Sequence, residues 1–343
     1  MDLHFSIDQP FGFKLYPYFQ TVYQIIVGRP TETFVFAPGA TPLSTDREVF
    51  SACIAYLVII FSTRHFMQYF KNPIPLKAVF MLHNVLLTLV SLSLLLLFIE
   101  QLFPIIARHG LFFAVCNDAA WTQPIELLYY LNYLVKYWEL ADTMFLALKK
   151  KKLEFLHYFH HSATMVLCYT QLCGKTSVSW VPITLNLAVH VAMYYYFFRT
   201  ASGAKIWWKR YLTTMQIVQF IIDLGFIYVC SFYYFGYAHF NILTKCAGED
   251  VAAAFGCALL TSYLLLFINF YFQTYKAKSK TMSKSKAAAS AGVLTVETKE
   301  GSGLAMKPEK TEKDGEKKAQ KKGKKKQQNG QQNGQQNGQQ NGR

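Results

Sequence analysis

The chain alternates long apolar runs with short polar connections between residues 49 and 275. Each run is close to the ~20 residues that a helix needs to cross a bilayer. We therefore predict an all-α polytopic membrane protein with seven transmembrane helices. Two runs, the third and the sixth, are weakened by polar residues. The predicted spans are 49–70, 77–99, 125–148, 153–173, 178–198, 211–235 and 251–273.

Basic residues in the connections alternate along the chain. The connections after the first, third and fifth runs hold at least three Lys or Arg each, whereas each of the others holds one. Because Lys and Arg concentrate on the cytoplasmic side, this alternation predicts a lumenal N-terminus and a cytosolic C-terminus. The basic side comprises Arg64, Lys71 and Lys77, then Lys149 to Lys152, then Arg199, Lys205, Lys209 and Arg210.

The two ends of the chain differ from its apolar body. Residues 1–48 are mixed, and the aromatic-rich stretch 13–28 could form a helix lying in the membrane interface. Residues 276–343 hold 17 of the 35 Lys and Arg, with only 6 acidic residues, and end in four QQNG units. We expect them to form a disordered basic cytosolic tail. Since the charge lies behind a membrane body, we expect no nucleic-acid partner.

The run 153–173 carries His157, His160 and His161. The spacings i, i+3 and i+4 place the three imidazoles on one face of a helix. Polar side chains inside a bilayer are costly and usually functional. This face is therefore the first candidate for a site.

Polar groups on other runs fall at a similar predicted depth. At ~1.5 Å per residue, five of the seven runs place polar side chains roughly 8–12 Å from the cytosolic end. Residues that share a depth indicate one site rather than scattered interhelical bonds. The members are His83, Asn84, Asp142, Thr143, His160, His190, Gln216 and Gln219; Lys136, Glu139, Asn186 and Tyr194 follow the same helical spacings.

Three kinds of chemistry fit this layer. An HxxHH box also occurs in membrane di-iron oxygenases, but five imidazoles within spans are few for two metal ions, and we expect no metal. A transporter could use Lys136, Glu139 and Asp142 as a proton relay. Acyl transfer suits a neutral imidazole nucleophile, with Asp142 orienting a box histidine and Asn186 or Gln216 donating to an oxyanion. Lysines at the cytosolic mouth, Lys149 and Lys209 among them, suit the phosphates of coenzyme A.

Four motifs occur in order: KxxExxDT (136–143), HxxHH (157–161), an NxxxHxxMYxYY-like stretch (186–197) and TxxQxxQ (213–219). Together they resemble the fatty-acid elongase (ELO) family over most of residues 10–276. Stretches such as LHYFHHSATMVLCYTQL look closest to fungal elongases that supply sphingolipid acyl chains. Two small departures are Phe197 at the final Tyr of the third motif and Ser162 where Gly usually follows the box.

The resemblance implies an endoplasmic reticulum enzyme that condenses acyl-CoA with malonyl-CoA to 3-oxoacyl-CoA, CO₂ and CoA. His160 would carry the acyl group, His190 would assist decarboxylation, and no bound cofactor or metal would be needed. Six or seven helices would enclose a narrow acyl tunnel, with walls from 94–97, 167–173, 225–235 and 252–260. Functional partners would be membrane lipids and the 3-ketoacyl reductase, dehydratase and enoyl reductase of the cycle; a homo-oligomer is left open. Cys116 and Cys246, in two predicted lumenal connections, are expected to form a disulfide.

Overall fold

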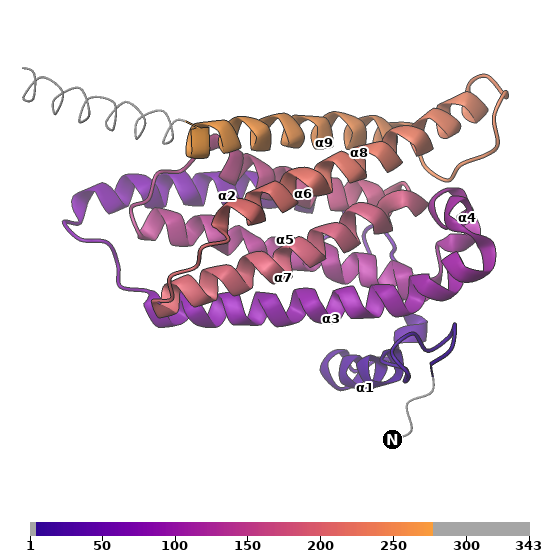
Figure 1. Cartoon of the computed structure of the whole chain (residues 1–343), viewed down its shortest axis with the longest axis horizontal. Coiled ribbons are helices and arrows are strands. Elements are labelled where there is room, and N and C mark those ends of the chain that lie inside the picture. Colours follow the sequence, from indigo (N-terminus) through magenta and orange to yellow (C-terminus); the bar gives the residue numbers. More distant parts are fainter. Residues whose placement is uncertain (1–4, 277–343) are drawn as a thin grey trace, which may run out of the picture. The chain divides into compact units, whose positions relative to one another are not determined.

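A computed structural model describes residues 5–276, and within this range the chain is all-helical (Figure 1). Each predicted span corresponds to one long helix. These are α2 (Asp46–Phe66), α3 (Lys77–His109), α5 (Gln123–Leu148), α6 (Phe155–Cys173), α7 (Trp180–Ser202), α8 (Lys209–Ala238) and α9 (Asp250–Tyr271). Two shorter helices are α1 (Tyr16–Val27) and α4 (Leu111–Cys116). The predicted tail lies outside the described residues, except for Lys276.

Five helices of the described part are long and apolar enough to cross a membrane, which supports a multi-pass membrane protein. They span Asp46–Tyr69, Lys77–His109, Ser177–Ser202, Lys209–Ala238 and Asp250–Tyr275, short terminal turns included. The run 211–235, expected to be weak, is among them. The two others, α5 and α6, carry the KxxExxDT motif and the histidines, whose polar side chains lower their apolarity. The count of seven spans stays a prediction.

The helix contacts close into a ring of six. Following the contacts around, α3 packs on α7, α7 on α8, α8 on α9, α9 on α6, α6 on α5, and α5 on α3. Helix α2 packs against α5 and α6. Figure 1 shows α8 and α9 side by side, joined by a loop at the right. A ring of this kind surrounds an interior lined by side chains from six helices.

The start of α1 is held to α3 by one carboxylate. Both oxygens of Glu100 accept backbone hydrogen bonds, from Leu15 N and Tyr16 N, each at 2.8 Å. These amides belong to the first turn of α1, where backbone N–H groups lack helical partners and the helix dipole favours negative charge. The helix expected within 13–28 is therefore present as α1, and none of its residues is buried.

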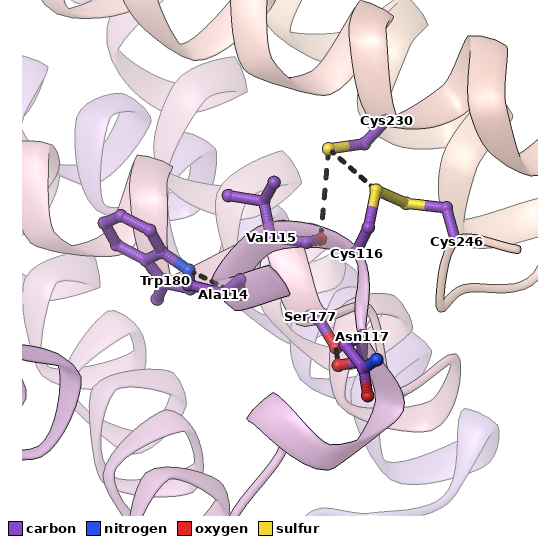
Figure 2. The surroundings of a disulfide bond; sticks show 8 residues. All are labelled: Ala114, Val115, Cys116, Asn117, Ser177, Trp180, Cys230 and Cys246. Atoms are coloured by element: carbon purple, nitrogen blue, oxygen red, sulfur yellow. Dashed lines mark hydrogen bonds between the residues drawn. A yellow bond between two sulfur atoms is a disulfide. The ribbon is translucent and has the colours of Figure 1, made fainter. Parts of the chain in front are cut away.

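A disulfide links α4 to the loop between α8 and α9 (Figure 2). Cys116, the last residue of α4, is joined to Cys246 in the loop between α8 and α9. The backbone adds to this link, since Ala247 N donates to Cys116 O at 2.7 Å. Cys230 of α8 lies beside the pair, with its Sγ 3.9 Å from that of Cys116. The expected cysteine pair is thus the one that fastens the loop between α8 and α9.

Candidate active site

The KxxExxDT motif supplies a buried ion pair. Lys136 and Glu139 are each 2% exposed, and their Nζ and Oε1 atoms are 2.9 Å apart. The i, i+3 spacing on α5 brings them together. Lys136 Nζ also donates to Oδ1 of Asn186 on α7, at 2.8 Å. Buried charges need such partners, because an unpaired charge in an apolar interior is strongly destabilising.

The contacts of His190 define its tautomer. Asn186 has its Oδ1 engaged by Lys136, so its Nδ2 is the atom that faces His190, and it donates to Nε2 at 3.2 Å. With Nε2 accepting, a neutral imidazole carries its proton on Nδ1, which lies 3.1 Å from Glu139 Oε1. Lys136, Glu139 and His190, all buried, and the half-buried Asn186 therefore form one polar group across α5 and α7.

Asp142 does not orient a box histidine by a hydrogen bond, contrary to the role expected for it. Its Oδ1 lies 2.8 Å from Nε2 of His83, and its Oδ2 accepts from the hydroxyl of Tyr194 at 2.7 Å. The physical reason is that α3 packs against both α5 and α7. His83 of α3 and Tyr194 of α7 therefore lie within hydrogen-bond distance of Asp142. The ring of Tyr194 in turn lies against that of His190, with centroids 5.3 Å apart. Asp142 is thus connected to His190 through Tyr194.

The HxxHH histidines form a cluster on α6. The rings of His157 and His161 are 5.5 Å apart, as are those of His160 and His161. His160 lies within electrostatic range of His190, Glu139 and Lys136. Its ring is surrounded by aromatic rings of α8 and α9, with Tyr263 at 4.7 Å and Phe267 at 5.8 Å. Its buried Nδ1 has no hydrogen-bond partner among residues 5–276.

One cavity begins at this cluster and extends between the helices. Its walls near the site include His160, Lys136 and Asn186, and toward the disulfide it reaches Tyr234 and Gly248. Most of the wall between is apolar. The predicted wall segments 167–173, 225–235 and 252–260 do line it. The segment 94–97 does not, because Leu94 and Leu97 are buried in the hydrophobic core instead.

The other predicted residues lie around this centre. The Thr143 hydroxyl accepts from that of Tyr56 on α2 at 2.8 Å. Gln216 contacts Sδ of Met193 at 3.7 Å, which turns its amide toward α7. Gln219 lines the cavity and donates to Oδ2 of Asp223 at 3.2 Å.

The two lysines chosen for coenzyme A differ in exposure. Lys209 is exposed at the start of α8. Lys149, just after α5, places its Nζ 3.2 Å from the centroid of the Phe80 ring. Burial lowers the pKa of the Lys149 ammonium from its usual value, and the charge of Lys151 lowers it further.

Sequence reasoning gave no specific role to His83, Asn132 or Asp223, all three of which are buried. His83 was predicted to lie in the polar layer, but no hydrogen-bond partner was predicted for it. Asp223 interrupts an apolar run four residues after Gln219, so the spacing TxxQxxQxxxD was the available signal. Asn132, four residues before Lys136, extends the polar face of α5 in the same way.

The comparisons with known proteins agree with the motifs. Residues 41–283 match the model of the family described as ELO: GNS1/SUR4 family. The chain is 44% identical over 300 residues to the putative fatty acid elongase 1 of Schizosaccharomyces pombe, covering 87% of this chain and 90% of the relative. It is 35% identical over 254 residues to fatty acid elongase A of Dictyostelium discoideum, covering 74% and 92%. On the strength of its motifs, its family match and its relatives, the chain belongs to the ELO (GNS1/SUR4) family.

Proposed function

We propose that this protein is the condensing enzyme of very-long-chain fatty acid elongation, and that His160 carries the acyl group as a covalent acyl-imidazole. One observation supports this above others. His160 lies at the head of a largely apolar cavity, beside the polar Lys–Glu–Asn–His group, with one ring nitrogen unpartnered. A cavity of this kind suits an acyl chain, and a neutral imidazole suits attack on a thioester.

The first half-reaction moves the acyl group. A nitrogen of His160 attacks the thioester carbonyl, the C–S bond breaks, and coenzyme A leaves as the thiol with the proton that the imidazole gives up. Lys136 Nζ and Asn186 Nδ2 are the donors available for the oxyanion, since both residues line the cavity. Gln216 is a further donor that a small rotation away from Met193 would free.

The second half-reaction forms the carbon–carbon bond. Malonyl-CoA loses CO₂, and the carbanion that remains attacks the acyl carbonyl on His160. The C–N bond then breaks, the ring nitrogen of His160 takes up a proton from solvent, and 3-oxoacyl-CoA leaves. His190 would assist decarboxylation, because the Glu139 carboxylate lies 3.1 Å from its Nδ1 and stabilises positive charge that develops on the ring. No metal or cofactor takes part in these steps.

The surroundings of this reaction are part of the proposal. The enzyme would lie in the endoplasmic reticulum membrane with a lumenal N-terminus and a cytosolic C-terminus. In this orientation the HxxHH histidines lie near the cytosolic face, where malonyl-CoA is available. Lys149 and Lys209 would attract its phosphates. The 3-oxo product must next be reduced, dehydrated and reduced again, and its acyl chains would feed sphingolipid synthesis.

Single-turnover labelling tests the proposal. Purified protein incubated with a long-chain acyl-CoA, without malonyl-CoA, should release free CoA and leave one acylated histidine in a 153–173 peptide. His160→Ala should abolish both signals, whereas His65→Ala, at an exposed position outside the site, should leave them intact. Equal labelling of wild type and His160→Ala would assign the carrier elsewhere. Absence of malonyl-CoA-dependent CO₂ release from wild type would instead favour a transporter.

A further inference from the structure

Asp223 is a carboxyl group inside the acyl cavity that the condensation does not use. It is 0% exposed and lines the cavity from α8. Its Oδ2 accepts from Gln219 Nε2 at 3.2 Å, but its Oδ1 has no partner among residues 5–276. A buried acceptor that is left unsatisfied is costly, and in an apolar channel within lipid it is more so. Its retention therefore requires a ligand or a structural reason.

A second unsatisfied acceptor faces the same space from the opposite wall. Asn132 of α5 is 1% exposed, lines the cavity, and leaves its Oδ1 unpartnered, while its Nδ2 contacts Cys168 Sγ at 3.8 Å. In the ring of six helices, α5 and α8 stand three positions apart, on opposite sides. An acyl chain that extends along the cavity would therefore pass both residues.

The two acceptors lie at different depths. Asp223 lies four residues after Gln219, which corresponds to ~6 Å along α8. Gln219 precedes Phe220, whose ring centroid lies 6.4 Å from that of His160, so Asp223 lies about one turn beyond His160. Asn132 lies deeper, because it contacts Cys168, which follows His160 by eight residues, or ~12 Å, on α6.

We propose that Asp223, with Gln219 beside it, forms a polar subsite that binds a hydroxyl group carried by the acyl chain. A plain methylene chain offers the unpartnered Oδ1 of Asp223 no donor, whereas one O–H can satisfy it. An extended chain advances about 1.2 Å per bond, so ~6 Å places the hydroxyl roughly five bonds beyond the thioester carbonyl. The inference rests on the proposed function and names a substrate class for it, the mid-chain hydroxyacyl-CoAs.

A matched pair of substrates tests this. Two saturated acyl-CoAs of equal length, one with a hydroxyl on the sixth carbon, are compared by kcat/KM with wild type, Asp223→Asn and Asp223→Leu. Wild type should prefer the hydroxylated chain by about tenfold, because a plain chain leaves the buried Oδ1 of Asp223 unpaired. Asp223→Leu should bring that ratio to about one or below, while Asp223→Asn, which keeps an acceptor oxygen and the shape, should retain part of the preference.

Two controls sharpen the result. Thr214→Val on the same helix removes an exposed hydroxyl that donates only to Arg210 O, and should leave the ratio unchanged. Moving the hydroxyl to the methyl end of the chain should abolish the wild-type preference. A ratio that is the same in wild type and Asp223→Leu overturns the subsite. An equal fall in kcat/KM for both substrates in Asp223→Leu also overturns it, and would show that Asp223 only positions Gln219.

Equilibrium binding separates this inference from the proposed function. The same two acyl-CoAs are titrated into wild type and the Asp223 variants without malonyl-CoA, so no condensation is required. Tighter binding of the hydroxylated chain that is lost in Asp223→Leu supports the subsite even if condensation is never observed. Condensation of plain acyl-CoA with no such binding difference would support the function and reject the subsite.

Discussion

The Nε2 atom of His83 on α3 lies 2.8 Å from Oδ1 of Asp142 on α5, and both side chains are shielded, with 6% and 13% of their surface exposed. The other oxygen of Asp142 accepts from Tyr194, whose ring lies against His190. A residue outside all four motifs is therefore connected to the candidate site through one carboxylate.

Replacing His83 with Phe should reduce both stability and condensation. The ring shape is kept, but Oδ1 of Asp142 loses its partner, which costs about 1–3 kcal/mol for a buried polar group. We expect a lower midpoint of thermal unfolding in detergent and a several-fold lower kcat. The matched change His65→Phe, at an exposed position on α2, should alter neither. Wild-type values for His83→Phe would show that the contact is dispensable.

Tyr194→Phe and His83→Phe should not be additive. Both changes remove a hydrogen bond to the carboxylate of Asp142. Once one bond is lost, removing the other should therefore lower the free energy of unfolding by less. A double-mutant cycle on the free energy of unfolding should give a coupling of roughly 0.5–3 kcal/mol. Independent effects that simply sum would argue against a shared network through Asp142.

The buried pair of Lys136 and Glu139 predicts a particular order of stabilities. Lys136→Met leaves the carboxylate of Glu139 buried without its ammonium partner, and should cost about 3–5 kcal/mol. The double change Lys136→Met/Glu139→Gln removes both charges and should be more stable than Lys136→Met alone, although inactive. Thermal unfolding of the three proteins in one detergent measures this order. A double variant that is the least stable of the three contradicts it.

The disulfide between Cys116 and Cys246 closes a loop of 130 residues. Cross-links over long loops constrain the unfolded chain most, so Cys116→Ser should destabilise by about 2–5 kcal/mol. Reducing agent should lower the unfolding temperature of wild type and leave that of Cys116→Ser unchanged. Cys230→Ser, next to the pair but outside it, serves as the control and should keep its sensitivity to reductant. Non-reducing peptide mapping that finds Cys116 and Cys246 as free thiols would contradict the pairing.

Metal removal should leave condensation unaffected. The proposed steps use imidazole, ammonium and amide groups, and none of them requires a metal ion. Dialysis against EDTA, followed by metal analysis and a CO₂-release assay, should show unchanged turnover. Activity that is lost on dialysis and restored by iron would indicate that the HxxHH box binds iron, as in membrane di-iron oxygenases.

Much of the fold followed from local pattern. Each predicted run became one helix, because runs of ~20 apolar residues have few other ways to satisfy their backbone in a membrane. The end of α3 was missed: the helix continues to His109, ten residues beyond the predicted span. Glu100, which interrupts the apolar pattern there, is used to bind the start of α1 while the helix runs on.

The candidate site was predicted as a set of residues rather than as a set of contacts. Helical spacing places Lys136 beside Glu139 whatever the rest of the chain does, and the structure contains that pair. Depth along each helix likewise placed His83, Asp142 and His190 in one layer. Neither spacing nor depth says which helices are neighbours.

By itself, therefore, the sequence determined the helices, the polar faces on them and the family to which the chain belongs, because these depend on periodicity and motif order. Only the tertiary structure decided the partners. The order of α3, α7, α8, α9, α6 and α5 around the ring assigns Asp142 to His83 and Tyr194 instead of to a box histidine. The same order sets Asn132 opposite Asp223. Contacts across helices depend on rotation and packing, which no single helix encodes.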